Sequence, residues 1–135
     1  RSIINIINNQ KEKVSFSPYK NLPREIFLSL YYHSSFIIGN SSSGILETAS
    51  FKKPAINVGD RQVGRFADDN VIFCKGEVDS IISAINKINS KTFKEKLTTI
   101  VNSYGEGNSA QKAFRLIKDI DFKKYLLKCE DPLEL

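Results

Sequence analysis

The chain has 135 residues and a formal net charge of +5, with two cysteines, one histidine and no methionine. This length fits one domain with a hydrophobic core. A single histidine excludes a zinc cluster, and Cys74 and Cys129 suggest neither a disulfide framework nor a metal site. The basic excess lies mainly in residues 91–128, mixed with acids and without interleaved aromatics, which favours a solvated helical face over a nucleic-acid surface.

The first third of the chain predicts a helix, a short strand and a second helix. Residues 1–10 are typical of a helix already under way, and the start at Arg1 without methionine predicts a fragment or a processed product. A turn at 11–13, a strand over 14–17 and a loop over 18–23 follow. Pro23 suits a helix start. The inward side chains of that helix are predicted to be Ile26, Phe27, Leu30 and Tyr31, and His33 falls in its last turn.

The central stretch predicts a strand, a loop, a helix and a second strand. Residues 36–38 are apolar and β-branched enough for a buried parallel strand. Small polar residues fill 40–44, and a helix is expected from there over 45–51, ended by Pro54. The strand over 55–58 then runs into Gly59-Asp60-Arg61.

The last half continues the alternation of strands and helices. We predict a loop over 63–70 and a strand over 71–74, with Cys74 as a small buried residue at its end. Asp79 or Ser80 is expected to cap a helix. Its predicted inward side chains are Ile81, Ile82, Ile85 and Ile88; those of the next two segments are Phe93, Leu97, Ile100 and Val101 within 89–104, and Ala113, Phe114, Leu116 and Ile117 within 110–120. A terminal helix over 122–127 and a frayed end at 131–135 complete the chain.

Four strands interleaved with helices predict a parallel α/β sheet. Such a narrow sheet should leave one edge open, so we expect the chain to pair with a copy of itself or to be only marginally stable.

Residues 40–61 form a candidate anion site. Loops at the carboxyl ends of parallel strands line the ligand crevice of doubly wound sheets. A helix that starts at Ser43 or Gly44 should point unpaired N–H groups into this crevice, beside the hydroxyls of the preceding serines. Arg61 could supply a cation for a diphosphate, and Glu47 could accept hydrogen bonds from a ribose diol. Arg65 is a weaker second candidate for the diphosphate.

Each of these residues also has an ordinary structural explanation. Serines commonly cap helices, a glutamate in a first turn compensates the helix dipole, and Arg61 could be a solvated loop residue. The functional interpretation depends on their combination at the ends of two successive strands.

The stretch GNSSSGILETASFKKPAINVGDRQVGR resembles the signature of UDP-N-acetylglucosamine 2-epimerases, especially the hydrolysing branch that makes N-acetylmannosamine for sialic-acid-type sugars. The resemblance extends from PREIFLSLYYHSSFIIGN to YGEGNSAQKAFRLI. It implies a partial C-terminal half of a GT-B fold: residues 1–121 as an incomplete Rossmann-like UDP-binding domain, and 122–135 as a C-terminal helix or tail. Non-hydrolysing relatives usually show an Asp-Ser-Gly-Gly loop, so the Asn40–Gly44 loop favours the hydrolysing branch.

The resemblance also implies roles for individual residues. Ser41, Ser42, Ser43 and Gly44 match the loop that holds the UDP diphosphate, and Glu47 matches the carboxylate that binds the uridine ribose. Arg61 matches an arginine at the nucleotide site, and Phe27 a position beside the uracil. The acid/base groups of the reaction would come mainly from a first domain that this chain lacks, so no catalytic residue, metal or cofactor is assigned to it.

The implied partners are UDP or UDP-N-acetylglucosamine, the missing N-terminal domain and a second copy in a homo-oligomer, in the cytoplasm, without nucleic acid or membrane. By itself the chain is expected to bind UDP weakly and to lack epimerase activity. Three alternatives stay open: the UDP-sugar-binding half of another GT-B glycosyltransferase, a non-catalytic α/β module such as a receiver-like domain, and a nucleic-acid-binding module.

Overall fold

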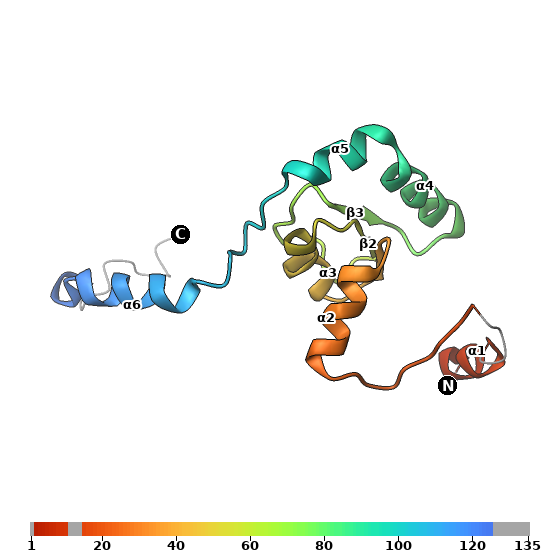
Figure 1. The fold of residues 1–135 in the computed structure, drawn as a ribbon, viewed down its shortest axis with the longest axis horizontal. Helices are drawn as coiled ribbons and strands as arrows, with labels where there is room; N and C mark the ends of the chain where they lie inside the picture. The colour runs from red at the N-terminus through yellow and green to blue at the C-terminus, as the bar shows by residue number, and fades with distance from the viewer. Residues whose placement is uncertain (1, 11–14, 126–135) are drawn as a thin grey trace, which may run out of the picture.

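The computed structural model describes residues 2–10 and 15–125, and a sheet of three parallel strands forms its centre (Figure 1). The strands are β1 (Ile37–Gly39), β2 (Ala55–Val58) and β3 (Val71–Cys74). Their spatial order is β1-β2-β3, with Ile56 aligned between Ile38 and Ile72. The predicted parallel α/β sheet is therefore confirmed.

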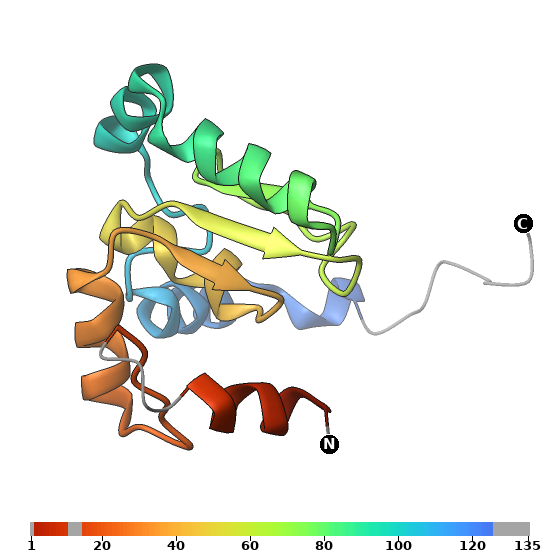
Figure 2. The ribbon, with the colours of Figure 1, turned by 90° about the vertical axis from the view of Figure 1, so that its right-hand side faces the viewer.

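Two helices cover one face of the sheet. They are α4 (Val78–Asn89) and α5 (Lys91–Thr99), and Figure 2 shows α4 lying along the strands. Ile56 from the central strand is almost fully buried against Ala84 and Ile88 of α4 and Phe93 of α5. Burying a large apolar side chain stabilises the fold by about 1.5–3 kcal/mol, so this cluster anchors the sheet.

The other face of the sheet carries α2 (Arg24–His33), α3 (Ser43–Leu46) and the 3₁₀ helix η1 (Thr48–Phe51). Successive side chains of a strand point to opposite faces, so Ala55 lies toward α3 while Ile56 lies toward α4. Gly44 in α3 lies so close to Ala55 that a methyl group added to it would stand 3.9 Å from the Ala55 Cβ. The 40–44 loop, which follows β1 at its carboxyl end, is thus held close to the sheet by the contact between Gly44 and Ala55.

The strand predicted over residues 14–17 is wrong for the part that the structure describes. Residues 15–17 form a turn and irregular backbone, and Phe16 is exposed, while Val14 lies outside the described residues. A short apolar alternation forms a strand only where a neighbour satisfies its backbone groups. The sheet thus has three strands among the described residues, and β1 pairs only with β2.

The helix predicted over residues 45–51 is broken in two. A single α-helical turn, α3, is followed by η1, and Lys52 adopts the left-handed conformation with φ of 52° before Pro54. The side chain of Thr48 explains part of the break, because its hydroxyl donates to the Gly44 carbonyl at 2.6 Å and competes with the regular backbone ladder.

Several predicted inward side chains are exposed. In α2 Ile26 and Leu30 face solvent while Tyr31 is buried, and in α4 Ile82 is exposed while Ala84 is buried. The helix α4 also starts at Val78, before the caps predicted at Asp79 or Ser80. Periodicity predicts that a helix has an apolar face, but its rotation depends on the sheet it contacts.

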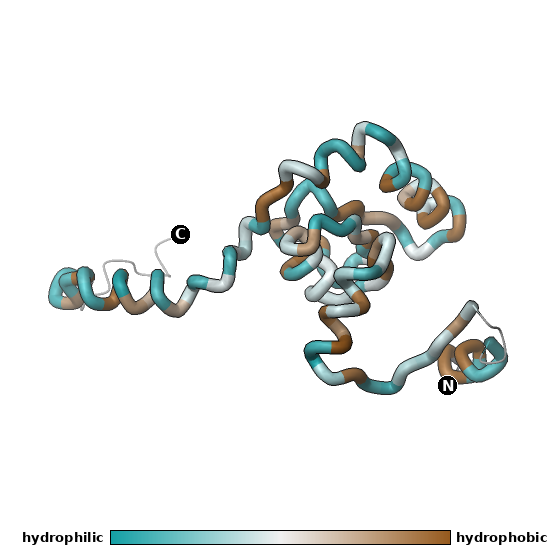
Figure 3. The backbone as a smooth tube through the Cα atoms, viewed as in Figure 1, coloured by the Kyte–Doolittle hydropathy of each residue, from teal (hydrophilic) through white to brown (hydrophobic). Residues whose placement is uncertain are grey.

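The ends of the described chain extend away from the sheet. Helix α6 (Ser109–Asp119) lies apart from the other elements, and Phe114, Leu116 and Ile117, predicted to be inward, are exposed (Figure 1). Val101 is exposed as well. At the other end, α1 (Ser2–Gln10) confirms the predicted helix and carries exposed isoleucines, visible as brown segments in Figure 3. The 3₁₀ helix η2 (Phe122–Tyr125) falls within the predicted terminal helix.

The remaining predictions divide into confirmed and undescribed parts. Confirmed elements are the 18–23 and 63–70 loops, the strands over 55–58 and 71–74, and the position of His33 in the last turn of α2. The turn at 11–13, residues 126–135 and Cys129 lie outside the described residues. None of the helices within the described ranges is both long and apolar enough to cross a bilayer.

Candidate functional site

A chain of three hydroxyl groups joins the serine loop to α2. The Tyr31 hydroxyl lies 2.6 Å from the Ser43 Oγ, which in turn lies 3.2 Å from the Ser41 Oγ. Either oxygen of each pair can donate, because hydroxyl hydrogens rotate to suit their partners. Tyr31 is held in place by aromatic contacts, its ring centre lying 4.5 Å from that of Phe27. The loop hydroxyls are therefore ordered by the fold before any ligand arrives.

The backbone at the start of α3 differs from the expectation of free N–H groups. The Gly44 N–H donates to the Ser41 carbonyl at 3.2 Å and the Ile45 N–H to the Ser42 carbonyl at 3.0 Å, while the Ser43 N–H donates to the Ser41 Oγ at 3.3 Å. These tight local bonds satisfy the donors that a helix start usually leaves unpaired. The prediction of several unpaired N–H groups here is wrong, and the hydroxyls become the main candidate donors.

The side chain of Ser42, unlike those of Ser41 and Ser43, is not used to cap the helix or to link the loop to α2. Ser42 precedes the first residue of α3, yet its side chain makes no capping hydrogen bond. It is half-buried in the same loop as Ser41 and Ser43. Its hydroxyl is therefore available to a ligand at no cost to the fold.

Glu47 forms an ion pair that sequence reasoning missed. Its Oε1 lies 2.5 Å from the Nη2 of Arg24, at the start of α2. The Glu47 side chain is 22% exposed, and its Oε2 is buried without a hydrogen-bond partner among the described residues. A buried acceptor without a donor costs about 1–3 kcal/mol. The carboxylate is thus held at one oxygen and lacks a donor at the other.

Residues on one face of α2 form a wall along the candidate site. Arg24, Phe27 and Tyr31 are spaced i, i+3, i+7 and so lie on the same side of the helix. A helix rises 1.5 Å per residue, which separates Arg24 from Tyr31 by about 10 Å. Tyr31 contacts the serine loop and Arg24 contacts Glu47, so the wall extends from the hydroxyl cluster to the carboxylate.

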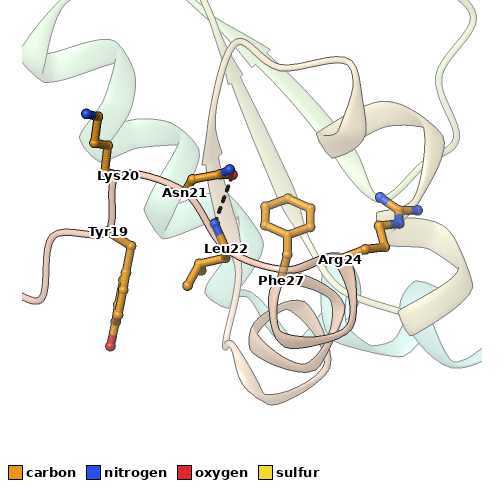
Figure 4. A pocket seen from close by; sticks show the side chains of 6 residues that line it. All are labelled: Tyr19, Lys20, Asn21, Leu22, Arg24 and Phe27. Carbon is orange, nitrogen blue, oxygen red and sulfur yellow. Dashed lines mark hydrogen bonds between the residues drawn. The ribbon is translucent and has the colours of Figure 1, made fainter.

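A hollow of about 490 Å³ lies at the Arg24 end of this wall (Figure 4). Arg24 and Phe27 line it from α2, and the preceding loop contributes Tyr19, Lys20, Asn21 and Leu22. Within this loop the Leu22 N–H donates to the Asn21 Oδ1 at 3.0 Å. Phe27 borders this hollow and also packs against Tyr31 with the two rings tilted by 44°, so its ring joins the hollow to the hydroxyl cluster.

The turn that carries Arg61 is attached to the serine loop through its neighbour. The Gln62 Nε2 donates to the Asn40 carbonyl at 3.0 Å, and Gln62 is buried. Gly59 has φ of +79° and its N–H donates to the Cys74 carbonyl at 2.8 Å, which fixes where the turn leaves the sheet. Arg61 is exposed beside Gln62. The two predicted loops are therefore neighbours, with the Arg61 side chain at their solvent side.

A buried polar network supports α3 from below. The Thr48 hydroxyl donates to the Gly44 carbonyl, and the Asn70 Nδ2 donates to Thr48 Oγ1 at 2.7 Å and to the Lys53 carbonyl at 2.8 Å. Thr48 and Asn70 are fully buried. Their bonds fix the short α3 turn against the start of β3.

The structure thus brings the predicted residues to one region. Ser41, Ser43, Glu47 and Phe27 are linked through α2, and Ser42 and Gly44 lie in the same loop. Arg61 is exposed next to Gln62, whose side chain is bonded to the Asn40 carbonyl of that loop. Sequence analysis missed Arg24, Gln62 and the polar role of Tyr31. The spacing along α2 could have indicated the first and last of these, but their partners come from distant parts of the chain.

A family model described as UDP-N-acetylglucosamine 2-epimerase matches residues 1–118. The chain belongs to this family. It is 37% identical over 111 residues to a Legionella pneumophila protein named UDP-N,N'-diacetylbacillosamine 2-epimerase (hydrolyzing), a match that covers 82% of this chain and 28% of that protein. A Campylobacter jejuni protein named GDP/UDP-N,N'-diacetylbacillosamine 2-epimerase (hydrolyzing) is 42% identical over 88 residues, covering 65% of this chain and 21% of its own length.

Two further comparisons agree with this membership. The Escherichia coli polysialic acid biosynthesis protein P7 is 38% identical over 95 residues, which covers 70% of this chain and 24% of that protein. A crystal structure of a UDP-N-acetylglucosamine 2-epimerase superposes with a TM-score of 0.62 at 16% identity, covering 95% of this chain and 35% of the other, and so shares the fold. The chain spans between a fifth and a third of the length of these curated relatives.

Proposed function

We propose that this chain is the UDP-binding part of a hydrolysing UDP-N-acetylglucosamine 2-epimerase. The observation that carries the proposal is that one helix, α2, contacts both the hydroxyl cluster, through Tyr31, and Glu47, through Arg24. This arrangement suits a nucleoside diphosphate, whose anionic end and ribose differ in the groups that bind them. Hydroxyls suit phosphate oxygens, and a carboxylate suits a vicinal diol.

Each part of UDP has proposed contacts. The loop of Ser41, Ser42, Ser43 and Gly44 holds the diphosphate, with Arg61 as the cation from the neighbouring turn. Glu47 accepts from the ribose hydroxyls. Phe27 lies beside the uracil, which the hollow at the start of α2 is large enough to receive.

In the whole protein these contacts act on the leaving group. The proposed reaction removes UDP from UDP-N-acetylglucosamine by elimination, and water then adds with inversion at C2 to give N-acetylmannosamine. Carboxylates that move the C2 proton would come from a part of the protein outside this chain. Charge that develops on the departing diphosphate is stabilised by preorganised donors, so Arg61 and the loop serines affect turnover as well as affinity. The chain by itself binds UDP weakly and has no epimerase activity.

Hydrolysis is favoured over simple epimerisation by two observations. The loop reads Asn40-Ser41-Ser42-Ser43-Gly44, which resembles the hydrolysing branch, and the similar proteins of Legionella and Campylobacter carry "(hydrolyzing)" in their names. Those names also support a second candidate substrate, UDP-N,N'-diacetylbacillosamine. The whole protein, given each nucleotide sugar in turn, distinguishes the two by the free hexosamine that is released.

Calorimetry with UDP, UMP and uridine tests the proposal on this chain. Glu47→Ala should weaken UDP and uridine alike, because both carry the ribose. Ser42→Ala should weaken UDP by about tenfold or more, the value of one charge-assisted hydrogen bond, and leave uridine unchanged. Since Ser42 caps nothing, this loss cannot arise from a damaged helix start.

Glu95→Ala is the matched control, because Glu95 is an exposed carboxylate on α5, where it pairs with Lys91 at 3.9 Å. It should leave all three affinities unchanged. The proposal fails if the unaltered chain binds no UDP, or if Glu95→Ala weakens UDP as much as Glu47→Ala does.

A further inference from the structure

We propose that Arg24 is a positioning residue for the ribose carboxylate: it holds one oxygen of Glu47 so that the other is directed to a ribose hydroxyl. This inference rests on the proposed function, because it assumes that Glu47 receives a ribose. It assigns a role to a residue whose hydrogen-bond partner among the described residues is Glu47.

The first step of the argument is the asymmetry of the Glu47 carboxylate. Its Oε1 is paired with the Arg24 Nη2, while its Oε2 is buried and has no donor among the described residues. An ionised carboxylate is an acceptor only and has about four acceptor positions. A hydroxyl of a vicinal diol supplies the kind of donor that the second oxygen lacks.

The second step concerns how Glu47 is fixed in position. Glu47 follows the single turn of α3 and precedes η1, so no long helix constrains it. Its neighbour Thr48 is fully buried and bonded to Asn70, which fixes the backbone. The orientation of the carboxylate itself is then determined by Arg24, the one side chain of the described residues that is bonded to it.

The third step concerns where Arg24 lies. It begins α2, and it lines the same hollow as Phe27 (Figure 4). Its guanidinium is bonded to Glu47, whereas Tyr31, two turns further along α2, lies against the Ser43 hydroxyl. Its pairing with Glu47 is the contact through which it acts on the ribose, while its place in the lining of the hollow borders the proposed position of the base.

The test compares UDP with 2′,3′-dideoxy-UDP, which keeps the base and the diphosphate but lacks the diol. Calorimetry on the chain gives a Kd for each, and their ratio measures recognition of the diol. Arg24→Met, of similar length but without donors, should lower the preference for UDP over the dideoxy compound about threefold to fivefold; the ratio cancels any change at the base, because both compounds keep it. Arg24→Lys, which keeps the charge, should restore part of the loss.

Two controls separate positioning from a general loss of charge or stability. Lys91→Met removes a cation of another ion pair, on α5, and should change neither Kd. In a Glu47→Ala background, Arg24→Met should not change the preference for UDP over the dideoxy compound any further, because Arg24 acts on the ribose through that carboxylate.

The outcomes distinguish the inference from the proposed function. If the unaltered chain binds UDP in preference to the dideoxy compound and Arg24→Met leaves the ratio unchanged, the inference is overturned and the proposed function stands. A tighter Kd of UDP in Arg24→Met would mean that Arg24 competes with the ribose, which also overturns it. If the unaltered chain binds no UDP, both the proposed function and this inference are refuted.

Discussion

Replacing Thr48 with valine should destabilise the chain more than the same replacement at a threonine on the exposed surface, such as Thr98 of α5. Thr48 is fully buried, and its Oγ1 both donates to the Gly44 carbonyl at 2.6 Å and accepts from the Asn70 Nδ2 at 2.7 Å. Valine fills the same volume, so the change removes two hydrogen bonds without opening a cavity. The expected loss of stability therefore comes from the Gly44 carbonyl and the Asn70 amide, which lose their hydrogen-bond partner.

The expected magnitude follows from the groups that are left without partners. The Gly44 carbonyl loses this donor, and one hydrogen of the Asn70 amide loses its acceptor, while the other keeps the Lys53 carbonyl at 2.8 Å. Each unsatisfied buried group costs about 1–3 kcal/mol, so for two such groups the free energy of unfolding should fall by roughly 2–6 kcal/mol. For a domain whose total stability is typically about 5–15 kcal/mol, this is a large fraction.

Urea denaturation followed by circular dichroism measures the change. Thr98→Val is the matched control, because the Thr98 hydroxyl donates to the Glu95 carbonyl at 2.7 Å on the exposed surface of α5. Its removal should cost less than about 0.5 kcal/mol. If Thr48→Val and Thr98→Val change the unfolding free energy equally, the buried network does not support α3 in the way the geometry indicates.

Two further predictions concern a pair of glycines and the described cysteine. Gly59→Ala should lower the unfolding free energy by about 1–2 kcal/mol, because φ at Gly59 is +79°. Gly44→Ala should fold normally, because its added methyl group would stand at an ordinary 3.9 Å from the Ala55 Cβ. Equal thermal stability of the two variants would contradict this prediction. Burial raises the pKa of the Cys74 thiol above its usual value of 9.0. The folded state therefore favours the neutral thiol, so its contribution to stability is present below pH 9.0 and is lost as pH rises through the raised pKa. In a Cys129→Ser background, alkylation by iodoacetamide should be slower in the native chain than in urea at pH 8, and equal rates would refute the shift.

The parts of the fold that the sequence predicted well are those determined by local pattern. The strands over 55–58 and 71–74 are short, mainly apolar runs bounded by Pro54, Gly59 and polar loops, and the structure has them at these residues. The strand over 14–17 failed because alternation predicts that a segment can pair, without supplying a neighbour to pair with. The prediction that the apolar face of α6 would be buried was wrong for a related reason. Periodicity predicts such a face, but burial needs a second surface, and the described residues place none against Phe114 or Ile117.

The candidate site was predictable in its residues more than in its contacts. The serine loop, Glu47 and Arg61 follow from the order strand, loop, helix, strand. The role of Tyr31 does not, because its partner Ser43 comes from the other side of a strand and a loop. The same holds for Arg24, which lies 23 residues from Glu47 in sequence. A side-chain pair between distant segments depends on how the helices are rotated when they pack. The sequence of either segment alone does not predict that rotation.

The shortness of α3 changes what can attract an anion at this loop. A helix dipole grows with the number of aligned peptide units, and four residues align few of them. The first N–H groups of α3 are also occupied by Ser41 and Ser42. Hydroxyls differ from these N–H groups because they can rotate, so Ser41, Ser43 and Tyr31 can turn from bonding one another to donating outward while the backbone stays in place. A chain of such hydroxyls polarises cooperatively. The proposed diphosphate site would therefore depend on the orientation of side-chain hydroxyls, with Arg61 as its proposed cation, more than on a helix terminus.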